Sequence, residues 1–226
     1  MNPIRRGLIA LTVLAVAGLS LPLAAQNAGA KPKIGIIGSG NVGTALAHQF
    51  SRSGIAVSIA NTRGAESLAP LVAELGPKVT ASSLSDAIGA DVIILAVPFR
   101  AHAAIGAAQR DWAGRTVIDA MNTYGIDPEE LQGMASSDVV ASAFKGAKIV
   151  KTLNQLPAKL LAKDPAENGG RRVMFVSSND AAAAASVAQL VERLGFATIA
   201  LGRIDQGGLL LDRGAPLVLQ NLIKLG

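Results

Sequence analysis

The chain has 226 residues, half of them apolar and 16% charged, with a formal net charge of +5. This length and composition predict a globular protein with a full core, made of one large domain or one domain and an annex. Two of the arginines lie in the first six residues, and the rest shows no basic run and few aromatic residues. We therefore expect no nucleic-acid partner. The absence of cysteine excludes disulfides, thiolate metal sites and a cysteine nucleophile.

Residues 1–30 have the pattern of a signal peptide. The pair Arg5 and Arg6 precedes a long apolar stretch, and small residues follow it with cleavage points after Ala25 and after Ala30. The alternative is an uncleaved membrane anchor, which the glycine, serine and proline inside the stretch disfavour. The arginine pair also partly matches a twin-arginine signal. We expect an exported, periplasmic protein with no stable membrane insertion once the leader is removed.

Beyond residue 31, short β-branched apolar runs alternate with helical patterns. The expected strands are 33–37, 56–60, 91–97, 116–119, 147–152, 173–177 and 197–201. The expected helices are 42–52, 66–75, 100–109 and 181–194. Continuous apolar strands indicate burial on both faces of a sheet. The alternation predicts an α/β fold with a Rossmann-type, doubly wound, mostly parallel sheet and a short C-terminal annex.

A glycine turn, GSGNVG, stands between the first expected strand and the first expected helix. Gly38 permits the tight turn, Gly40 lets a pyrophosphate approach the backbone, and Gly43 lets the helix pack on the strand. The start of the helix adds free N–H donors and the positive end of its dipole. The alternative is a turn that serves packing alone. Because a second strand follows within about thirty residues, the context favours a dinucleotide site.

The end of the second expected strand indicates which dinucleotide is bound. NAD enzymes usually place an Asp or Glu there, but no acidic residue occurs between positions 33 and 65. Asn61, Thr62 and Arg63 stand there instead, and a hydroxyl and a guanidinium can bind a 2′-phosphate. The alternative is that Thr62 only caps the next helix and Arg63 is a solvated charge. The sequence therefore predicts NADP as the cofactor.

Candidates for acid–base chemistry are few. The two histidines, His48 and His102, have no ligand partners at metal spacing. We expect His48 to be an ordinary residue on a helix face and His102 to pack rather than to react. Asn122 and Asn154 each follow an expected parallel strand, so both should lie at the carboxyl edge of the sheet. Hydride transfer between two rings requires positioning in a water-poor cleft and no nucleophile. A sparse set of reactive side chains suits that reaction.

Five segments taken in order, IGIIGSGNVGTALA, ANTRG, ILAVPF, VIDAMN and VKTLNQLPAKLL, resemble the NADP oxidoreductases of the coenzyme F420-dependent type. The resemblance implies an NADP-binding Rossmann domain at 31–155. It also implies that 156–226 completes the sheet and helps to close a deazaflavin pocket. The cofactor-binding residues expected from the motifs and the resemblance are Gly38, Ser39, Gly40, Asn41, Val42, Gly43, Asn61, Thr62, Arg63, Ala96, Val97 and Pro98. The residues expected at the nicotinamide and its acceptor are Asn122 and Asn154.

Three functions remain open at this point. The first is an NADP-dependent reductase with a small-molecule hydride acceptor, coenzyme F420 being the co-substrate. The second is the same scaffold acting on a flavin, a quinone or a ferric complex, as the related reductase domains of membrane metalloreductases do. The third is a non-enzymatic NADP sensor. A homodimer is compatible with each of them.

Overall fold

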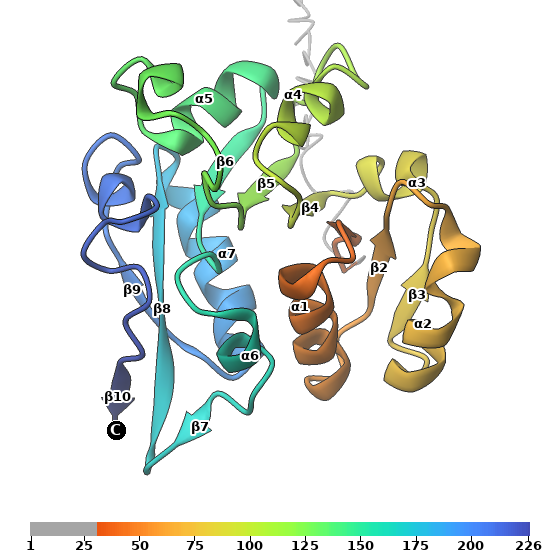
Figure 1. The fold of residues 1–226 in the computed structure, drawn as a ribbon. Coiled ribbons are helices and arrows are strands. Elements are labelled where there is room, and N and C mark those ends of the chain that lie inside the picture. The colour runs from red at the N-terminus through yellow and green to blue at the C-terminus, as the bar shows by residue number, and fades with distance from the viewer. Residues whose placement is uncertain (1–30) are drawn as a thin grey trace, which may run out of the picture. The chain divides into compact units, whose positions relative to one another are not determined.

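The computed structural model describes residues 31–226, and the expected signal peptide at 1–30 lies outside the described residues. The central strands run parallel to one another: β1 (Ile34–Ile37), β2 (Val57–Ala60), β3 (Val79–Ala81), β4 (Val92–Leu95), β5 (Thr116–Asp119) and β6 (Lys148–Lys151). Their order across the sheet is β6-β5-β4-β1-β2-β3, so the chain reverses its direction of travel between β1 and β4 (Figure 1). This is the doubly wound order of a Rossmann sheet. The predicted fold class is confirmed.

The C-terminal portion extends this sheet beyond β6. Its long strand, β8 (Gly170–Ser178), pairs antiparallel with β6 through its last two residues. Three further strands then pair with β8: β7 (Ala166–Glu167), β9 (Ala197–Ala200) and β10 (Ile223–Leu225). Residues 32–226 thus form one compact unit.

The helices alternate with the strands along the chain. Their bounds are α1 (Asn41–Arg52), α2 (Ala69–Leu75), α3 (Leu84–Ile88), α4 (Ala101–Gly106), α5 (Ser136–Ala143), α6 (Ala158–Leu161) and α7 (Ala181–Arg193). Short 3-10 turns occur at η2 (Ala65–Leu68), η3 (Pro128–Leu131) and η4 (Gly207–Leu211). Within 31–226 no helix is both long and apolar enough to span a bilayer.

Several expected bounds were wrong. The helix expected at 66–75 begins as a 3-10 turn, and Pro70, which has no N–H to donate, stands in the first turn of α2. The helix expected at 100–109 ends at Gly106, which packs closely against α5. The sequence did not predict β3, β7, β10, α3, α5 or α6, because segments of two to eight residues are too short to show a clear period.

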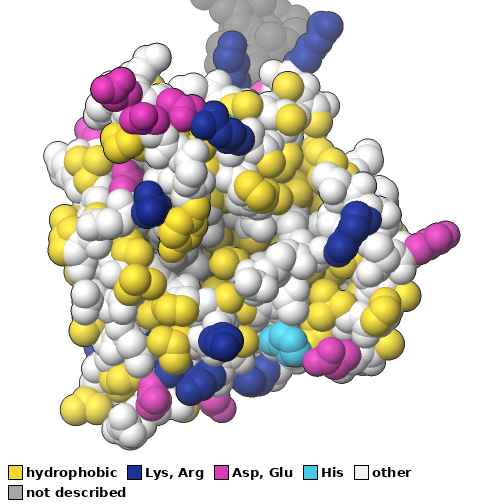
Figure 2. Space-filling view, viewed as in Figure 1, with side chains coloured by type: hydrophobic (Ala, Val, Ile, Leu, Met, Phe, Trp, Pro, Cys, Tyr) yellow, Lys and Arg dark blue, Asp and Glu magenta, His cyan; other side chains and the backbone are white. Residues whose placement is uncertain are grey.

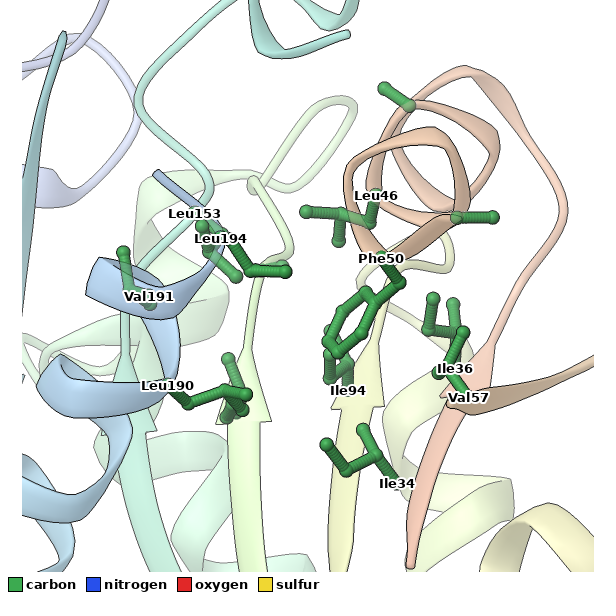
Figure 3. Packing of buried hydrophobic residues seen from close by; sticks show 14 of the residues in the cluster. Ile34, Ile36, Leu46, Phe50, Val57, Ile94, Leu153, Leu190, Val191 and Leu194 are labelled. Atoms are coloured by element: carbon green, nitrogen blue, oxygen red, sulfur yellow. The ribbon is translucent and has the colours of Figure 1, made fainter. Parts of the chain in front are cut away.

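The side chains of alternate residues in the central strands pack into two apolar layers, one on each face of the sheet. On one face Ile34, Ile36 and Ile94 pack beneath α1, whose Leu46 and Phe50 point toward them (Figure 3). The same layer continues under α6 and α7, where Figure 3 shows Leu194 beside Leu153, with Leu190 and Val191 on the preceding turn of α7. On the other face the strands pack against α3, α4 and α5. Because both faces are covered, the strand residues are apolar almost without alternation.

Candidate functional site

Backbone segments approach one another very closely at the glycine turn between β1 and α1. Gly38 has φ of +113°, and a Cβ placed on it would lie 2.1 Å from the carbonyl oxygen of Ala96. A Cβ on Gly43 would lie 1.9 Å from the carbonyl oxygen of Gly38. Both positions must therefore be glycine for the backbone to close. A Cβ on Gly40, by contrast, would meet no atom of residues 31–226 within 4 Å, so its surroundings are open.

The amino end of α1 faces this open space. Gly40 is the N-cap residue, and in the described part of the chain no side chain caps this end and no acidic residue lies in the first turn. The first N–H groups of a helix have no acceptor within the helix, and they carry the positive end of its dipole. An exposed Gly40 beside unpaired donors fits a phosphate group that approaches the backbone directly.

A second loop, after β2, is joined to the glycine turn by Asn61. The Asn61 side-chain nitrogen donates to Ser39 Oγ at 2.9 Å and to Ser67 Oγ at 3.0 Å. Its Oδ1 accepts from the N–H of Arg63 at 2.9 Å, which shapes the loop as an Asx turn. Asn61 therefore fixes the second loop against the first. The sequence predicted Asn61 as a cofactor-binding residue but did not single out Ser67, because an isolated serine carries no motif.

The side chains of Thr62 and Arg63 are exposed on this second loop. Arg63 forms none of the ion pairs found among residues 31–226. β2 ends in Ala60 and the residue that follows is an amide, so no carboxylate stands where a ribose 2′-hydroxyl would be held. The loop can supply a hydroxyl and a free guanidinium to an anion.

The loop after β4 forms the next wall. The N–H of Ala96 donates to the carbonyl oxygen of Ile37 at 2.9 Å, so the chain stays extended beside β1 for one residue past the strand. The Ala96 carbonyl and the Val97 side chain are the groups that a Cβ on Gly38 would strike. Val97 is half-buried and Pro98 is exposed. Together these residues give an uncharged, mostly apolar wall next to the glycine turn.

The asparagines after β5 and β6 are brought together as their strand positions predict. The Asn154 side-chain nitrogen donates to Asn122 Oδ1 at 3.1 Å and to the carbonyl oxygen of Leu211 at 2.7 Å. The Asn122 side-chain nitrogen donates to the carbonyl oxygen of Asn154 at 2.9 Å. Leu153, the buried residue before this pair, has φ of +64°, a conformation that is uncommon for leucine.

The two asparagines differ in accessibility. Asn154 is only 2% exposed, and its Oδ1 has no hydrogen-bond partner within the described residues. Asn122 is half-buried, so it is the member of the pair that can meet a ligand without rearrangement. Asn154 holds Asn122 in place and ties it to the segment around Leu211. Neither side chain titrates.

A buried ion pair beneath the asparagines was missed by the sequence analysis. Lys151 Nζ lies 3.2 Å from Asp119 Oδ2, and both side chains are almost fully buried. Lys151 also donates to the carbonyl oxygen of Met121 at 2.9 Å and to Ser136 Oγ at 3.2 Å. Asp119 accepts from Ser137 Oγ at 2.6 Å. The sequence did contain a sign of this ion pair: β5 and β6 are buried, apolar strands, and each of them ends in a charged residue.

The polar groups of this network bind one another and the backbone. Each donor position of the Lys151 ammonium has an acceptor. The other oxygen of Asp119 accepts from the N–H of Met121 at 2.9 Å. Both charges are thereby used to hold the backbone at Met121, next to Asn122. The network therefore supports the backbone at the carboxyl ends of β5 and β6.

His102 is buried, whereas His48 is partly exposed on the face of α1. His102 is 8% exposed; its Nδ1 lies 2.6 Å from the carbonyl oxygen of Phe99, and its ring centre lies 4.7 Å from that of Phe99. His48 lies 3.8 Å from the carboxylate of Glu74 on α2. In residues 31–226 no group of three His, Asp or Glu side chains could hold a metal ion.

The surface around the amino end of α1 is neutral in its middle. Figure 2 shows apolar and uncharged side chains over this part of the molecule, with Lys and Arg side chains set at intervals around it. Such a surface can exclude water from a flat ring while attracting an anionic molecule to its rim.

Known proteins share both the motifs and the fold. Residues 33–123 match the family described as NADP oxidoreductase, coenzyme F420-dependent. A crystal structure of a hypothetical protein from Sinorhizobium meliloti is 42% identical, with a TM-score of 0.82, over 86% of this chain and 96% of that one. A candidate F420-dependent NADP reductase from an Arthrobacter species is 30% identical, with a TM-score of 0.66, over 80% of this chain and 90% of that one.

More distant relatives are longer proteins. An imine reductase from Aspergillus terreus, solved in complex with NADPH4, is 25% identical with a TM-score of 0.59, and the chain covers 58% of it. The metalloreductase STEAP3 of Rattus norvegicus is 25% identical over 76% of this chain, which spans 34% of the length of that protein. The identity to the Arthrobacter reductase over nearly its whole length agrees with the motif match. The chain therefore belongs to the family of coenzyme F420-dependent NADP oxidoreductases.

Proposed function

We propose that the protein binds NADP(H) in the cleft between the glycine turn and the asparagine pair, and transfers a hydride between its nicotinamide and a ring-shaped acceptor. The observation that carries this proposal is the open space at Gly40 beside a second loop that has Arg63, and that has an amide and no carboxylate directly after β2. A deazaflavin of the coenzyme F420 kind is the first candidate for the acceptor, which the family membership supports.

The residues of the cleft fit the parts of the dinucleotide. The backbone from Ser39 to Val42 would hold the pyrophosphate, and Thr62 and Arg63 would hold the 2′-phosphate. Ala96, Val97 and Pro98 would flank the path toward the nicotinamide, and Asn122 would lie beside its ring. When bound, the cofactor supplies the hydride. The chain binds it, orients it and excludes water.

The reaction is balanced without a proton-transferring side chain. The acceptor gains a hydride, and it takes a proton from water where its reduced form requires one, so that it is reduced by two electrons and NADP⁺ is released. This agrees with a cleft in which the asparagines do not titrate and the Lys151–Asp119 pair is fully engaged. Rate acceleration would come from holding two rings in contact.

A second acceptor class is a flavin, a quinone or a ferric complex. The similarity to a metalloreductase supports this alternative, because the chain aligns with a part of that protein. Reduction of a ferric complex needs single electrons, so each hydride would reduce two ferric ions to ferrous ions and release one proton to water. The binding residues proposed for NADP(H) are the same in both cases.

The test is to follow NADPH oxidation by the purified protein with coenzyme F420, FMN, a soluble quinone and ferric citrate in parallel. The proposal predicts that at least one ring acceptor is reduced with a rate that saturates in both substrates. A protein that binds NADPH tightly and accelerates none of these reactions would instead be a sensor.

A further inference from the structure

The amino end of α5 is capped by a residue that lies far away along the chain. Ala135, the N-cap residue, has no polar side chain, and Ser136, the first residue of the helix, is fully buried. The Asp212 carboxylate accepts from the N–H of Ser136 at 3.1 Å and also from Ser136 Oγ. A carboxylate at this place satisfies a free N–H of the helix and meets the positive end of its dipole. Asp212 therefore fastens the C-terminal segment 211–219 to α5.

This contact continues inward to the buried ion pair. A hydroxyl has one hydrogen to donate and two lone pairs with which to accept. Ser136 Oγ donates to Asp212 and accepts from Lys151 Nζ at 3.2 Å. Lys151 Nζ in turn lies 3.2 Å from Asp119 Oδ2 at the end of β5. Asp212 is thus one end of a chain of hydrogen bonds that reaches the ends of β5 and β6.

The residue before Asp212 holds the asparagine pair. The carbonyl oxygen of Leu211 accepts from the Asn154 side chain at 2.7 Å, and Asn154 donates to Asn122 Oδ1 at 3.1 Å. Because Leu211 and Asp212 are adjacent, a shift of the carboxylate would also move the carbonyl group that orients Asn154. The geometry of the asparagine pair therefore depends on a carboxylate whose own hydrogen bonds go to α5.

We propose that Asp212 is a positioning residue for hydride transfer: it fastens the segment 211–219 to α5 and, through Leu211, sets the orientation of the asparagine pair toward the nicotinamide. The carboxylate itself touches neither cofactor nor acceptor in this role. The proposal deepens the proposed function and rests on it for the placement of the nicotinamide beside Asn122.

Hydrogen exchange of the protein without cofactor tests the fastening. Asp212→Asn keeps the shape of the side chain, but it removes the charge and turns an NH2 group toward a donor of Ser136. The amides of Ser136 and Leu219 report on the segment, because the first donates to Asp212 and the second to the carbonyl oxygen of Gln155 at 2.7 Å. Peptides that contain them should exchange about tenfold or more faster in the variant, as expected when a charge-assisted hydrogen bond is lost.

Asp205→Asn is the matched control. It removes the same charge from the same part of the chain, but Asp205 is exposed and its carboxylate lies 2.9 Å from Arg203 Nε. Exchange at Ser136 and Leu219 should stay at the rate of the parent. Melting temperatures of both variants establish that the fold is kept.

The fluorescence of bound NADPH tests whether the fastening positions the nicotinamide. A nicotinamide that is held still and away from water emits for longer than one that is free in solution. In Asp212→Asn the fluorescence lifetime of bound NADPH should fall toward that of free NADPH. The affinity for NADPH should stay within a few fold, because the phosphates are held at other loops.

A double-variant cycle assigns the effect to the contact between Asp212 and Ser136. Ser136→Ala removes the hydroxyl partner and should shorten the lifetime as well. The double variant should be no more affected than the worse of the two single variants, because both changes break one interaction.

The outcomes separate this proposal from the proposed function. Exchange at the parent's rate in Asp212→Asn would overturn the role of Asp212, and so would an unchanged lifetime of bound NADPH. Parallel loss of melting temperature and NADPH affinity would leave Asp212 a structural residue only and would also overturn the proposal. A parent that fails to bind NADPH would overturn the proposed function, whereas exchange is measured without cofactor and still decides whether Asp212 fastens the segment.

Discussion

The three glycines of the turn between β1 and α1 have different roles. Gly38 and Gly43 face backbone atoms so closely that any side chain would push the turn open, whereas Gly40 faces empty space. Gly40 has φ of −76°, so neither packing nor backbone conformation requires glycine at this position. The open position is therefore the strongest residue-level sign of a ligand.

Gly40→Ala tests this reading. Gly40 has φ of −76° and ψ of −169°, which alanine adopts without strain, so the melting temperature should stay close to that of the parent. The new methyl group would stand where the pyrophosphate approaches, and NADPH affinity should fall about tenfold or more, as it would for about 1.4 kcal/mol or more of lost binding free energy. Calorimetric titration with NADPH measures this. An unchanged dissociation constant would show that the space at Gly40 is not used.

Gly43→Ala is the matched control in the same turn. Its Cβ would overlap the carbonyl oxygen of Gly38, so we expect loss of stability and of binding together. If Gly43→Ala has the same melting temperature as the parent, the close contact between Gly43 and the Gly38 carbonyl oxygen is wrong, and the expectation for Gly40→Ala loses its basis.

Asn154→Ala tests the asparagine pair. The change removes the donors to Asn122 and to Leu211, so it should loosen the reacting end of the cleft and lower the single-turnover rate of NADPH oxidation about tenfold or more. NADPH affinity should remain within a few fold, because the phosphate contacts lie at other loops. Stopped-flow oxidation with excess protein separates the two quantities. An unchanged rate, or loss of folding with binding, would make Asn154 purely structural.

At the level of elements, the buried pair Asp119–Lys151 joins the ends of β5 and β6. Lys151→Met should lower the free energy of unfolding by about 3–5 kcal/mol, because it leaves the Asp119 carboxylate buried without its cation. Urea denaturation measures the loss. The double variant Lys151→Met with Asp119→Asn removes both charges and should recover part of it. A single variant as stable as the parent would refute the importance of the pair.

The sequence predicted the elements whose patterns are local. β1, β2, β4, β5 and β6 are buried on both faces and read as apolar runs, and their expected bounds differ from the structure by at most two residues. The glycine turn and the loop after β2 are equally local, since their residues are close along the chain. The short elements were missed because two to five residues of β3, α3 or β7 carry too little periodicity.

The contacts that complete the site are long-range, and the sequence could not show them. Asn154 meets Leu211 and Ser136 meets Asp212 across 57 and 76 residues. The pairing of Lys151 with Asp119 depends on β5 and β6 being neighbours in the same register. Strand order can be predicted from the fold class. The path of the segment 211–219 past the end of β6 cannot be predicted, because no repeat or motif in the sequence indicates it.

At the scale of the whole molecule, the position of the C-terminal portion is what completes the candidate site. β8 lies against β6, and the segment that follows β9 returns to the strand ends, where Leu211 accepts from Asn154 and the N–H of Leu219 donates to the carbonyl oxygen of Gln155. The C-terminal portion thus holds the asparagine pair in place. We propose that this short portion replaces the larger substrate domains of longer relatives, of which this chain spans only a part.

Export is a prediction for the whole chain that rests on the sequence. We propose that residues 1–30 direct the protein to the periplasm, and the pair Arg5–Arg6 suggests transport in the folded state with its dinucleotide bound. N-terminal sequencing of the protein from the producing cells should give a start near Gln26 or Lys31. An intact Met1 on protein recovered from the cytoplasm would contradict export.

The most direct test of the central claim is the affinity of the purified protein for NADPH and for NADH, measured side by side with Arg63→Ala. The account predicts that the parent binds NADPH more tightly. The variant should narrow that preference about tenfold or more, since a charge-assisted contact to the 2′-phosphate is lost. The affinity for NADH should change little. Equal affinity of the parent for the two cofactors would contradict the assignment of the loop after β2 as an NADP site.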